Sequence, residues 1–286
     1  MPDVSIILPA YNEAPVIASV LERIRAVAPP GDTWEILVVD DGSDDGTGDA
    51  AEAAGARVVR HPYNKGNGAA VKSGLRAARG EKICLLDADG QHDPGEIQRL
   101  LDRLGDHDLI IGYRSGGAGG GWTRWFGNWF YNRLASYLAR RPILDVTSGF
   151  RAARLAPMAE FIPLYPNGFS YPITSTLALI KAGYNVDFEP INVSKRVGKS
   201  KIRIIRDGSR FVMIALRIVS LFSPLRIFLP IAASLFAAGA GYGVYTIFDE
   251  SRVTNTSVLF CLSALIIFLI GLVSEQIALM RFERRG

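Results

Sequence analysis

The chain has few of the residues on which disulfide, thiolate and histidine chemistry depend. It contains 2 cysteines and 3 histidines in 286 residues. Cys84 falls in a predicted strand and Cys261 in a predicted membrane span, so we expect neither a disulfide framework nor a cysteine metal site. No P-loop is present and no GxGxxG follows the first predicted strand, which disfavours an ATPase and a dinucleotide-dependent dehydrogenase. The formal net charge of +4 is modest, and we expect no nucleic-acid partner.

Charge is missing altogether from two stretches near the C-terminal end. Residues 227–248 and 253–274 contain no Asp, Glu, Lys or Arg. Each run would be roughly 33 Å long as a helix, enough to cross the hydrocarbon core of a bilayer. A buried hydrophobic hairpin of a soluble protein is the alternative. Because two such runs follow one another, we expect two transmembrane helices and an integral membrane protein.

Positive charge lies on the outer flanks of these two runs. Lysines and arginines crowd residues 195–226 and 281–285, whereas the connection 249–253 holds one arginine and two acids. By the positive-inside rule, both flanks are cytoplasmic and the connection is outside. Val4–Leu8 is too short for the apolar part of a signal peptide, so we expect both termini in the cytoplasm, at the cytoplasmic membrane. The basic flank is expected to attract anionic lipid.

Apolar runs and amphipathic stretches alternate through residues 1–112. The pattern predicts strands with helices between them, the strands lying at 4–8, 35–39, 58–59, 83–86 and 109–112. Such alternation is typical of the α/β class, with a mostly parallel, Rossmann-like sheet covered by helices on both faces. Ligands of these sheets bind beyond the carboxyl ends of the strands. Three polar turns are expected there: PAYNE (9–13), DDGSDDGT (40–47) and DADGQHD (87–93).

The turn at 87–93 is the most informative of the three. Asp87, Asp89 and Asp93, with Gln91 among them, come directly after the buried strand predicted at 83–86. Such carboxylates repel one another unless a cation joins them, and oxygen ligands suit Mg²⁺ or Mn²⁺. The alternative is an acidic turn in which Asp93 caps the next helix, and for Asp93 itself we expect that role. For Asp87, Asp89 and Gln91 we expect a metal site.

The three turns together favour a nucleotide ligand. Carboxylates at neighbouring strand ends can accept hydrogen bonds from base N–H groups and ribose hydroxyls. Taken alone, 40–47 could be a solvated loop that caps a helix. Since no glycine-rich phosphate cradle is present, the simplest ligand is a nucleotide whose diphosphate is held through the metal.

The motifs also resemble those of a known family. PAYNE, VVDDGSDDGT, HPYNKGNGAAVKSGLRAARG, DADGQHDP, IGYRSG and DVTSGFR occur in the order and spacing of glycosyltransferase family 2. The resemblance spans roughly residues 3–205. Within this family, the motifs resemble those of the polyprenyl-phosphate (dolichol-phosphate mannosyltransferase-like) glycosyltransferases. It implies a GT-A fold, a divalent metal and an inverting transfer from a UDP- or GDP-sugar to polyprenyl phosphate.

Residue roles follow from the same resemblance. It implies that the nucleotide-sugar is bound by Pro9, Tyr11, Glu13, Val39, Asp41, Asp87, Ala88, Asp89, Arg114, Arg196 and Lys201. Asp87, Asp89 and Gln91 would hold the metal. Asp89, Arg114 and Asp145 would be catalytic, with Asp145 orienting the acceptor, acting as a base or capping its own turn.

The acceptor phosphate has several candidate partners. Where the family often has a Ser-Arg pair, this chain has Gly127 and Asn128, so Arg124 and Asn128 join Arg114 as candidates. Arg151 could bind phosphate or brace its loop. A phosphate acceptor is already anionic near neutral pH, so its attack on the sugar needs no strong general base. Positioning and charge stabilisation can carry the catalysis.

The expected domains are a GT-A domain at 1–201, an interfacial amphipathic helix at 202–224 and a two-span domain at 225–286. Two other functions stay open. A processive polysaccharide synthase would need more spans and a QxxRW motif, and neither is present. A non-catalytic nucleotide-sugar sensor would not need both DADGQ and the basic KRVGKSK sequence at 195–201. The aromatic segment 122–137 and the spans could also join protomers in a homo-oligomer.

Overall fold

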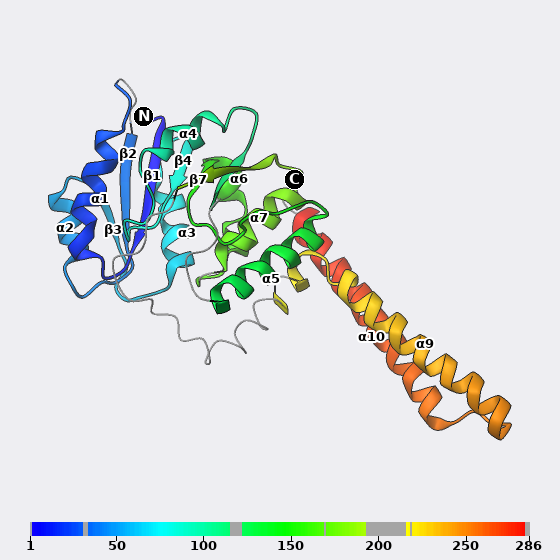
Figure 1. Cartoon of the computed structure of the whole chain (residues 1–286). Helices are drawn as coiled ribbons and strands as arrows, with labels where there is room; N and C mark the ends of the chain where they lie inside the picture. The colour runs from blue at the N-terminus through cyan, green and yellow to red at the C-terminus, as the bar shows by residue number, and fades with distance from the viewer. Residues whose placement is uncertain are drawn as a thin grey trace. The chain divides into compact units, whose positions relative to one another are not determined.

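The computed structural model describes residues 2–30, 34–114, 122–168, 170–192, 216–217 and 219–283, with the backbone alone for 122–126, 250 and 281–283. The chain divides into two compact units, Met1–Asp207 and Gly208–Gly286. Figure 1 shows the elements of both units along the chain.

The first unit is built on a mixed, mostly parallel sheet. Within the described residues the sheet has 7 strands in the order β3-β2-β1-β4-β6-β5-β7. The pairs β1–β2, β1–β4, β2–β3 and β5–β7 are parallel, whereas β6 is antiparallel to β4 and β5. The strands are β1 (Val4–Ala10), β2 (Trp34–Asp40), β3 (Arg57–Arg60), β4 (Lys82–Leu85), β5 (Leu109–Arg114), β6 (Arg151–Arg154) and β7 (Val186–Ile191). The predicted α/β class and the five predicted strands are confirmed.

Helices connect these strands. They are α1 (Ala14–Ala26), α2 (Thr47–Ala53), α3 (Asn67–Ala77), α4 (Glu96–Asp102), α5 (Trp122–Ala139), α6 (Leu155–Glu160), the 3₁₀ helix η1 (Ile162–Leu164) and α7 (Tyr171–Lys181). The helix after the acidic turn begins at Glu96, and the Gly95 N–H just before it donates to Oδ1 of Asp93 at 3.1 Å. The prediction that helices lie between the strands is confirmed.

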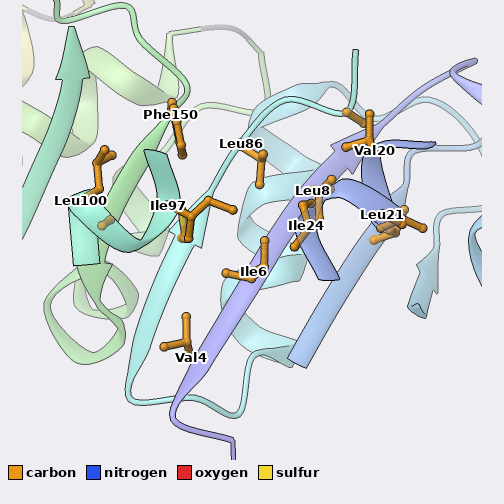
Figure 2. Packing of buried hydrophobic residues seen from close by; sticks show 14 of the residues in the cluster. Val4, Ile6, Leu8, Val20, Leu21, Ile24, Leu86, Ile97, Leu100 and Phe150 are labelled. Atoms are coloured by element: carbon orange, nitrogen blue, oxygen red, sulfur yellow. The ribbon is translucent and has the colours of Figure 1, made fainter. Parts of the chain in front are cut away.

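The alternation of side chains along β1 distributes the core over both faces of the sheet. Ile6 and Leu8 point to the face that packs against α1 and α4, where Ile24 and Ile97 are completely buried (Figure 2). Burying side chains of this size contributes about 1.5–3 kcal/mol each. This core fixes the strand ends from which the polar turns extend.

The opposite face of β1 is covered by α3, and Gly74 allows the close approach. A Cβ atom at Gly74 would lie 2.4 Å from Cγ2 of Ile7 and 3.3 Å from Cγ2 of Val39. Any larger residue would therefore push α3 away from β1 and β2. Because the loop 61–66 leads directly into α3, this packing also fixes the position of that loop.

The second unit contains α9 (Leu225–Glu250) and α10 (Asn255–Glu283). Both are long and apolar enough to cross a membrane, with mean hydropathy of 1.7 over Leu225–Asp249 and 2.7 over Asn255–Met280. The prediction of two long apolar helices is confirmed. Most of the amphipathic helix predicted at 202–224 lies outside the described residues.

Small residues allow α9 and α10 to pack closely. A Cβ atom at Gly239 would lie 2.7 Å from Cβ of Phe260, and one at Gly243 would lie 2.4 Å from Oγ of Ser257. The Ser257 hydroxyl donates to the carbonyl oxygen of Gly239 at 2.8 Å. Close backbone approach and hydrogen bonds between helices are how apolar helices associate in a lipid environment.

Candidate active site at the carboxyl edge of the sheet

The three polar turns extend from the same edge of the sheet. Ala10 and Asp40 are paired at the carboxyl ends of the parallel strands β1 and β2. Strand β4, on the other side of β1, ends at Leu85 and runs parallel to it. The turns at 9–13, 40–47 and 87–93 therefore lie side by side, at the edge where ligands of α/β sheets bind.

The first two turns are hydrogen-bonded into one unit. The Asn12 N–H donates to Oγ of Ser43 at 3.0 Å, and the Asp44 N–H donates to Oδ1 of Asn12 at 3.2 Å. The Glu13 N–H donates to Oγ1 of Thr47 at 2.9 Å. Asn12 adopts a φ of 55°, in the left-handed region that asparagine tolerates better than most residues. Neither turn can shift without the other.

The residues proposed for the nucleotide differ greatly in exposure. Tyr11 is 39% exposed, and Pro9 and Glu13 are partly buried. Val39 is completely buried. Asp41 is 2% exposed. Its carboxylate accepts hydrogen bonds from the 61–66 segment, which places Asp41 beneath the surface formed by the turns.

The third turn presents two carboxylates and an amide. Asp87, Asp89 and Gln91 are partly buried, whereas Ala88 is 2% exposed. The Gln91 N–H donates to Oδ1 of Asp89 at 3.1 Å, which holds the turn closed. A Cβ atom at Gly149 would lie 2.9 Å from Oδ2 of Asp87. Glycine at 149 therefore lets the acidic turn and the 145–151 segment meet.

This donor set fits a hard divalent cation. Among the described residues no group of three or more His, Cys, Asp or Glu side chains could hold a metal. Mg²⁺ does not need such a cage, since it is usually held by one or two carboxylates together with water and substrate phosphate. Asp87, whose side chain is 41% exposed, and Asp89 satisfy that requirement, and Gln91 adds a neutral oxygen.

Arg114 is oriented by Asp145. Its Nε donates to Oδ2 of Asp145 at 3.0 Å, and the side chains are 21% and 9% exposed. The other carboxylate oxygen of Asp145 accepts the N–H and the hydroxyl of Thr147, at 3.2 and 2.8 Å. With its oxygens used in this way, Asp145 caps its own turn and fixes the direction of the guanidinium.

Helix α5 holds the same turn from the other side. Oδ1 of Asn132 accepts the Val146 N–H at 2.9 Å, and its Nδ2 donates to the Leu144 carbonyl at 2.8 Å. Asn128 lies one turn earlier, with its Oδ1 3.5 Å from the Thr147 hydroxyl. No role for Asn132 or Thr147 follows from the sequence. Asn132 is marked there only by its helical spacing from Asn128.

Of the two roles considered for Arg151, the structure supports bracing of its loop and argues against binding of the acceptor phosphate. Its side chain is completely buried. The guanidinium donates to the carbonyl oxygens of Ser148, Pro172 and Val146 and to the hydroxyls of Ser175 and Thr176, at 2.7–3.0 Å. Because the N–H groups of the guanidinium are directed to these protein acceptors, Arg151 braces the 145–151 segment against α7.

Three predicted site residues fall outside what the structure describes. Arg196 and Lys201 lie outside the described residues, and Arg124 is described only by its backbone in α5. His92, which was not assigned to the site, lies beside it. Its Nε2 is 3.6 Å from Oδ2 of Asp87 and its ring lies 5.0 Å from that of Phe150.

Comparison with known proteins identifies the family. The first unit, a mostly parallel sheet with acidic turns at its carboxyl edge, has the GT-A fold. The model of "Glycosyl transferase family 2" matches residues 5–160, and that of the "GtrB C-terminal hairpin" matches residues 223–280. The chain belongs to glycosyl transferase family 2 and is a glycosyltransferase.

Individual relatives agree with this assignment. The chain is 31% identical to an undecaprenyl-phosphate mannosyltransferase of Micrococcus luteus, over 68% of this chain and 86% of the relative. It is 32% identical to a polyprenol monophosphomannose synthase of Mycolicibacterium smegmatis, over 69% and 80%. Its fold is similar to glucosyl-3-phosphoglycerate synthase of Mycobacterium tuberculosis, solved with Mn²⁺, UDP and glucosyl-3-phosphoglycerate. That similarity has a TM-score of 0.62 at 21% identity, over 77% of this chain and 79% of the other.

Proposed function

We propose that the enzyme transfers a sugar from a UDP- or GDP-sugar to polyprenyl phosphate at the cytoplasmic face of the membrane, with inversion. The observation that supports this most strongly is the presence of two features in one chain. One is the acidic carboxyl edge of a GT-A sheet, and the other is a hairpin of two helices long and apolar enough to cross a membrane. Relatives named for undecaprenyl phosphate and polyprenol acceptors support the same acceptor class.

In this proposal the donor nucleotide lies over the joined turns at 9–13 and 40–47. Pro9, Tyr11 and Glu13 contact it directly, Val39 contributes backbone, and Asp41 supports the surface from below. Asp87, Ala88 and Asp89 face the diphosphate. Asp87, Asp89 and Gln91 would hold Mg²⁺ or Mn²⁺, which supplies positive charge to the departing diphosphate when bound.

Arg114 is the residue that we assign to the acceptor phosphate or the donor diphosphate. Its guanidinium carries a permanent charge, and Asp145 holds it in one orientation without being needed as a base. A phosphate oxygen of the acceptor forms the new bond to the sugar carbon while the bond to the donor diphosphate breaks. Because the acceptor is already an anion, no proton has to be removed first. Preorganised charge then lowers the barrier.

The remaining parts of the proposal concern the membrane. Arg196 and Lys201 close over the donor phosphates, and Arg124 with Asn128 helps to bind the acceptor. The basic flanks keep both termini in the cytoplasm. The proposed domains are a GT-A domain at 1–201, an interfacial helix at 202–224 and a two-span domain at 225–286. The interfacial helix and the two spans would anchor the enzyme at the membrane surface, where the acceptor headgroup lies.

A labelled-donor assay tests the proposal. Purified protein in detergent is incubated with Mn²⁺, a short polyprenyl phosphate and, in turn, labelled UDP- or GDP-linked glucose, mannose, galactose, an amino sugar and a pentose. Label in a lipid that carries a single sugar supports the proposal. Label in polymer indicates a processive synthase instead. Donor binding without turnover in every combination indicates a non-catalytic sensor.

A further inference from the structure

A chain of three hydrogen-bonded side chains, two of them buried, lies beneath the joined turns. Nδ1 of His61 is 2.6 Å from Oδ1 of Asp41, and Nε2 of the same ring is 2.8 Å from Oγ of Ser73 on α3. His61 is 8% exposed and Asp41 is 2% exposed. The ring therefore links the end of β2 to α3 in a place that water hardly reaches.

The direction of these hydrogen bonds follows from the other partners of Asp41. Its carboxylate also accepts the N–H groups of Lys65 and Gly66, at 3.0 and 2.8 Å. Asp41 is thus an acceptor throughout, and Nδ1 of His61 must donate to it. Nε2 can then accept the Ser73 hydroxyl, which fixes the plane of the ring. A hydrogen bond to a charged acceptor is roughly twice as strong as a neutral one.

Backbone hydrogen bonds also join the 61–66 segment to the turn at 40–47. The His61 N–H donates to the Asp40 carbonyl at 2.9 Å, and the Asp41 N–H joins the same turn to β1 by donating to the Ala10 carbonyl at 2.9 Å. A Cβ atom at Gly42 would lie 2.4 Å from the carbonyl carbon of Tyr63. The two segments are in direct backbone contact, and Asp41 is the side chain that both share.

We propose that His61 is a positioning residue for the donor nucleotide. It holds the carboxylate of Asp41, and through Asp41 it fixes the 40–47 and 61–66 segments in the arrangement that receives the base and ribose. Ser73 sets the plane of the ring. This inference rests on the proposed function, because it concerns the surface to which the nucleotide of that reaction binds.

Two substitutions of His61 separate its two hydrogen bonds. His61→Asn keeps an N–H donor where Nδ1 stands and retains the bond to Asp41. His61→Gln reaches to the position of Nε2 and retains only a partner for Ser73. Both lose the buried ring, so a purely structural role would affect them alike. His107, a partly exposed residue near Asp187, receives the same two substitutions as a control.

The measurement is the Kd of the full-length protein for UDP and for GDP in the presence of Mn²⁺, by titration calorimetry, together with the unfolding midpoint. We expect His61→Gln to raise the Kd about tenfold and His61→Asn less than about threefold. The KM for polyprenyl phosphate stays unchanged in both. Ser73→Ala, a milder change, raises the Kd about threefold.

Equal Kd values for the two His61 variants would overturn this inference alone, as would a Kd unaffected by all three changes. Failure of the wild-type protein to bind either nucleotide would overturn the proposed function as well. If His61→Gln does not fold, the comparison of Ser73→Ala with the wild type decides, and an unchanged Kd contradicts the inference.

Discussion

Nε of Arg114 donates a hydrogen bond of 3.0 Å to Oδ2 of Asp145, across 31 positions of sequence. The pair joins the carboxyl end of β5 to the turn that begins DVTSGFR. It leaves Arg114 21% exposed while Asp145 is 9% exposed. The arginine is thus aimed by a carboxylate that is itself hardly accessible.

The first prediction concerns this pair. Asp145→Asn keeps the shape of the turn but replaces the acceptor of the Arg114 bond with a neutral amide. Losing the charged partner should lower kcat by about 10- to 100-fold, since a hydrogen bond to a charged group contributes about 1.5–3 kcal/mol. Steady-state kinetics of sugar transfer at several pH values measure this. If Asp145 were instead a general base, the loss would be larger and the acid limb of the pH profile would disappear.

The second prediction concerns Arg151, the buried brace. Arg151→Met removes the guanidinium donor from the buried carbonyls of Ser148 and Val146, whereas the Pro172 carbonyl keeps hydrogen bonds from the Ser175 and Thr176 hydroxyls. We expect the free energy of unfolding to fall by about 3 kcal/mol or more, because unpaired buried polar groups are costly. Thermal unfolding of the purified protein, followed by circular dichroism, measures the change. Arg76→Met, at an exposed position of α3, is the control and should have little effect. Equal midpoints for the two variants would contradict the bracing role.

The third prediction concerns pH and Glu35. Burial alone would raise the pKa of Glu35, but hydrogen bonds from Ser5, the Arg79 N–H and Arg57 outweigh it and lower the pKa below its ordinary 4.5. A lowered pKa in the folded state stabilises the protein above pH 4.5, and this contribution is lost as the pH falls toward the folded-state pKa. The stability difference between wild type and Glu35→Gln should therefore shrink below pH 4.5. A difference that grows on acidification would contradict this.

The fourth prediction concerns the packing of α9 against α10. Gly243→Leu places a side chain where even a Cβ atom would be 2.4 Å from Oγ of Ser257. A Cβ atom at Gly241 would have no atom from outside its own stretch of helix within 4 Å. We expect Gly243→Leu to lower the unfolding temperature in detergent and to expose the hairpin to proteolysis. Gly241→Leu, two residues away in the same helix, serves as the matched control. Similar proteolysis of both variants would show that α9 and α10 do not pack through this face.

The sequence was sufficient to predict much of the fold and the place of the site. Strong apolar periodicity placed β1 to β5 and the helices between them, and the polar turns marked the carboxyl edge. Strand β6 was not predicted, because its four residues, RAAR, contain no β-branched or aromatic side chain. Its antiparallel pairing depends on contacts with β4 and β5, which are distant in sequence.

Roles that depend on burial could not be predicted from residue type. From residue type alone, the arginine in DVTSGFR could bind a phosphate or donate to buried carbonyl and hydroxyl groups. The second role became evident only from the packing of the arginine against α7. Likewise, His61 lies in a motif that was noted for its family resemblance. Its bond to Asp41 joins residues 20 positions apart, and no local pattern in the sequence reports it.

The most direct test of the account uses crystals of the protein grown with Mn²⁺ and UDP or GDP, with anomalous diffraction used to locate the ion. We expect Mn²⁺ bound by Asp87, Asp89 or Gln91 and in contact with the diphosphate. We also expect Asp89→Asn to remain folded and bound to membranes but to lose the ion and sugar transfer. Nucleotide bound with no ion touching residues 87–91, or full activity of Asp89→Asn, would contradict it.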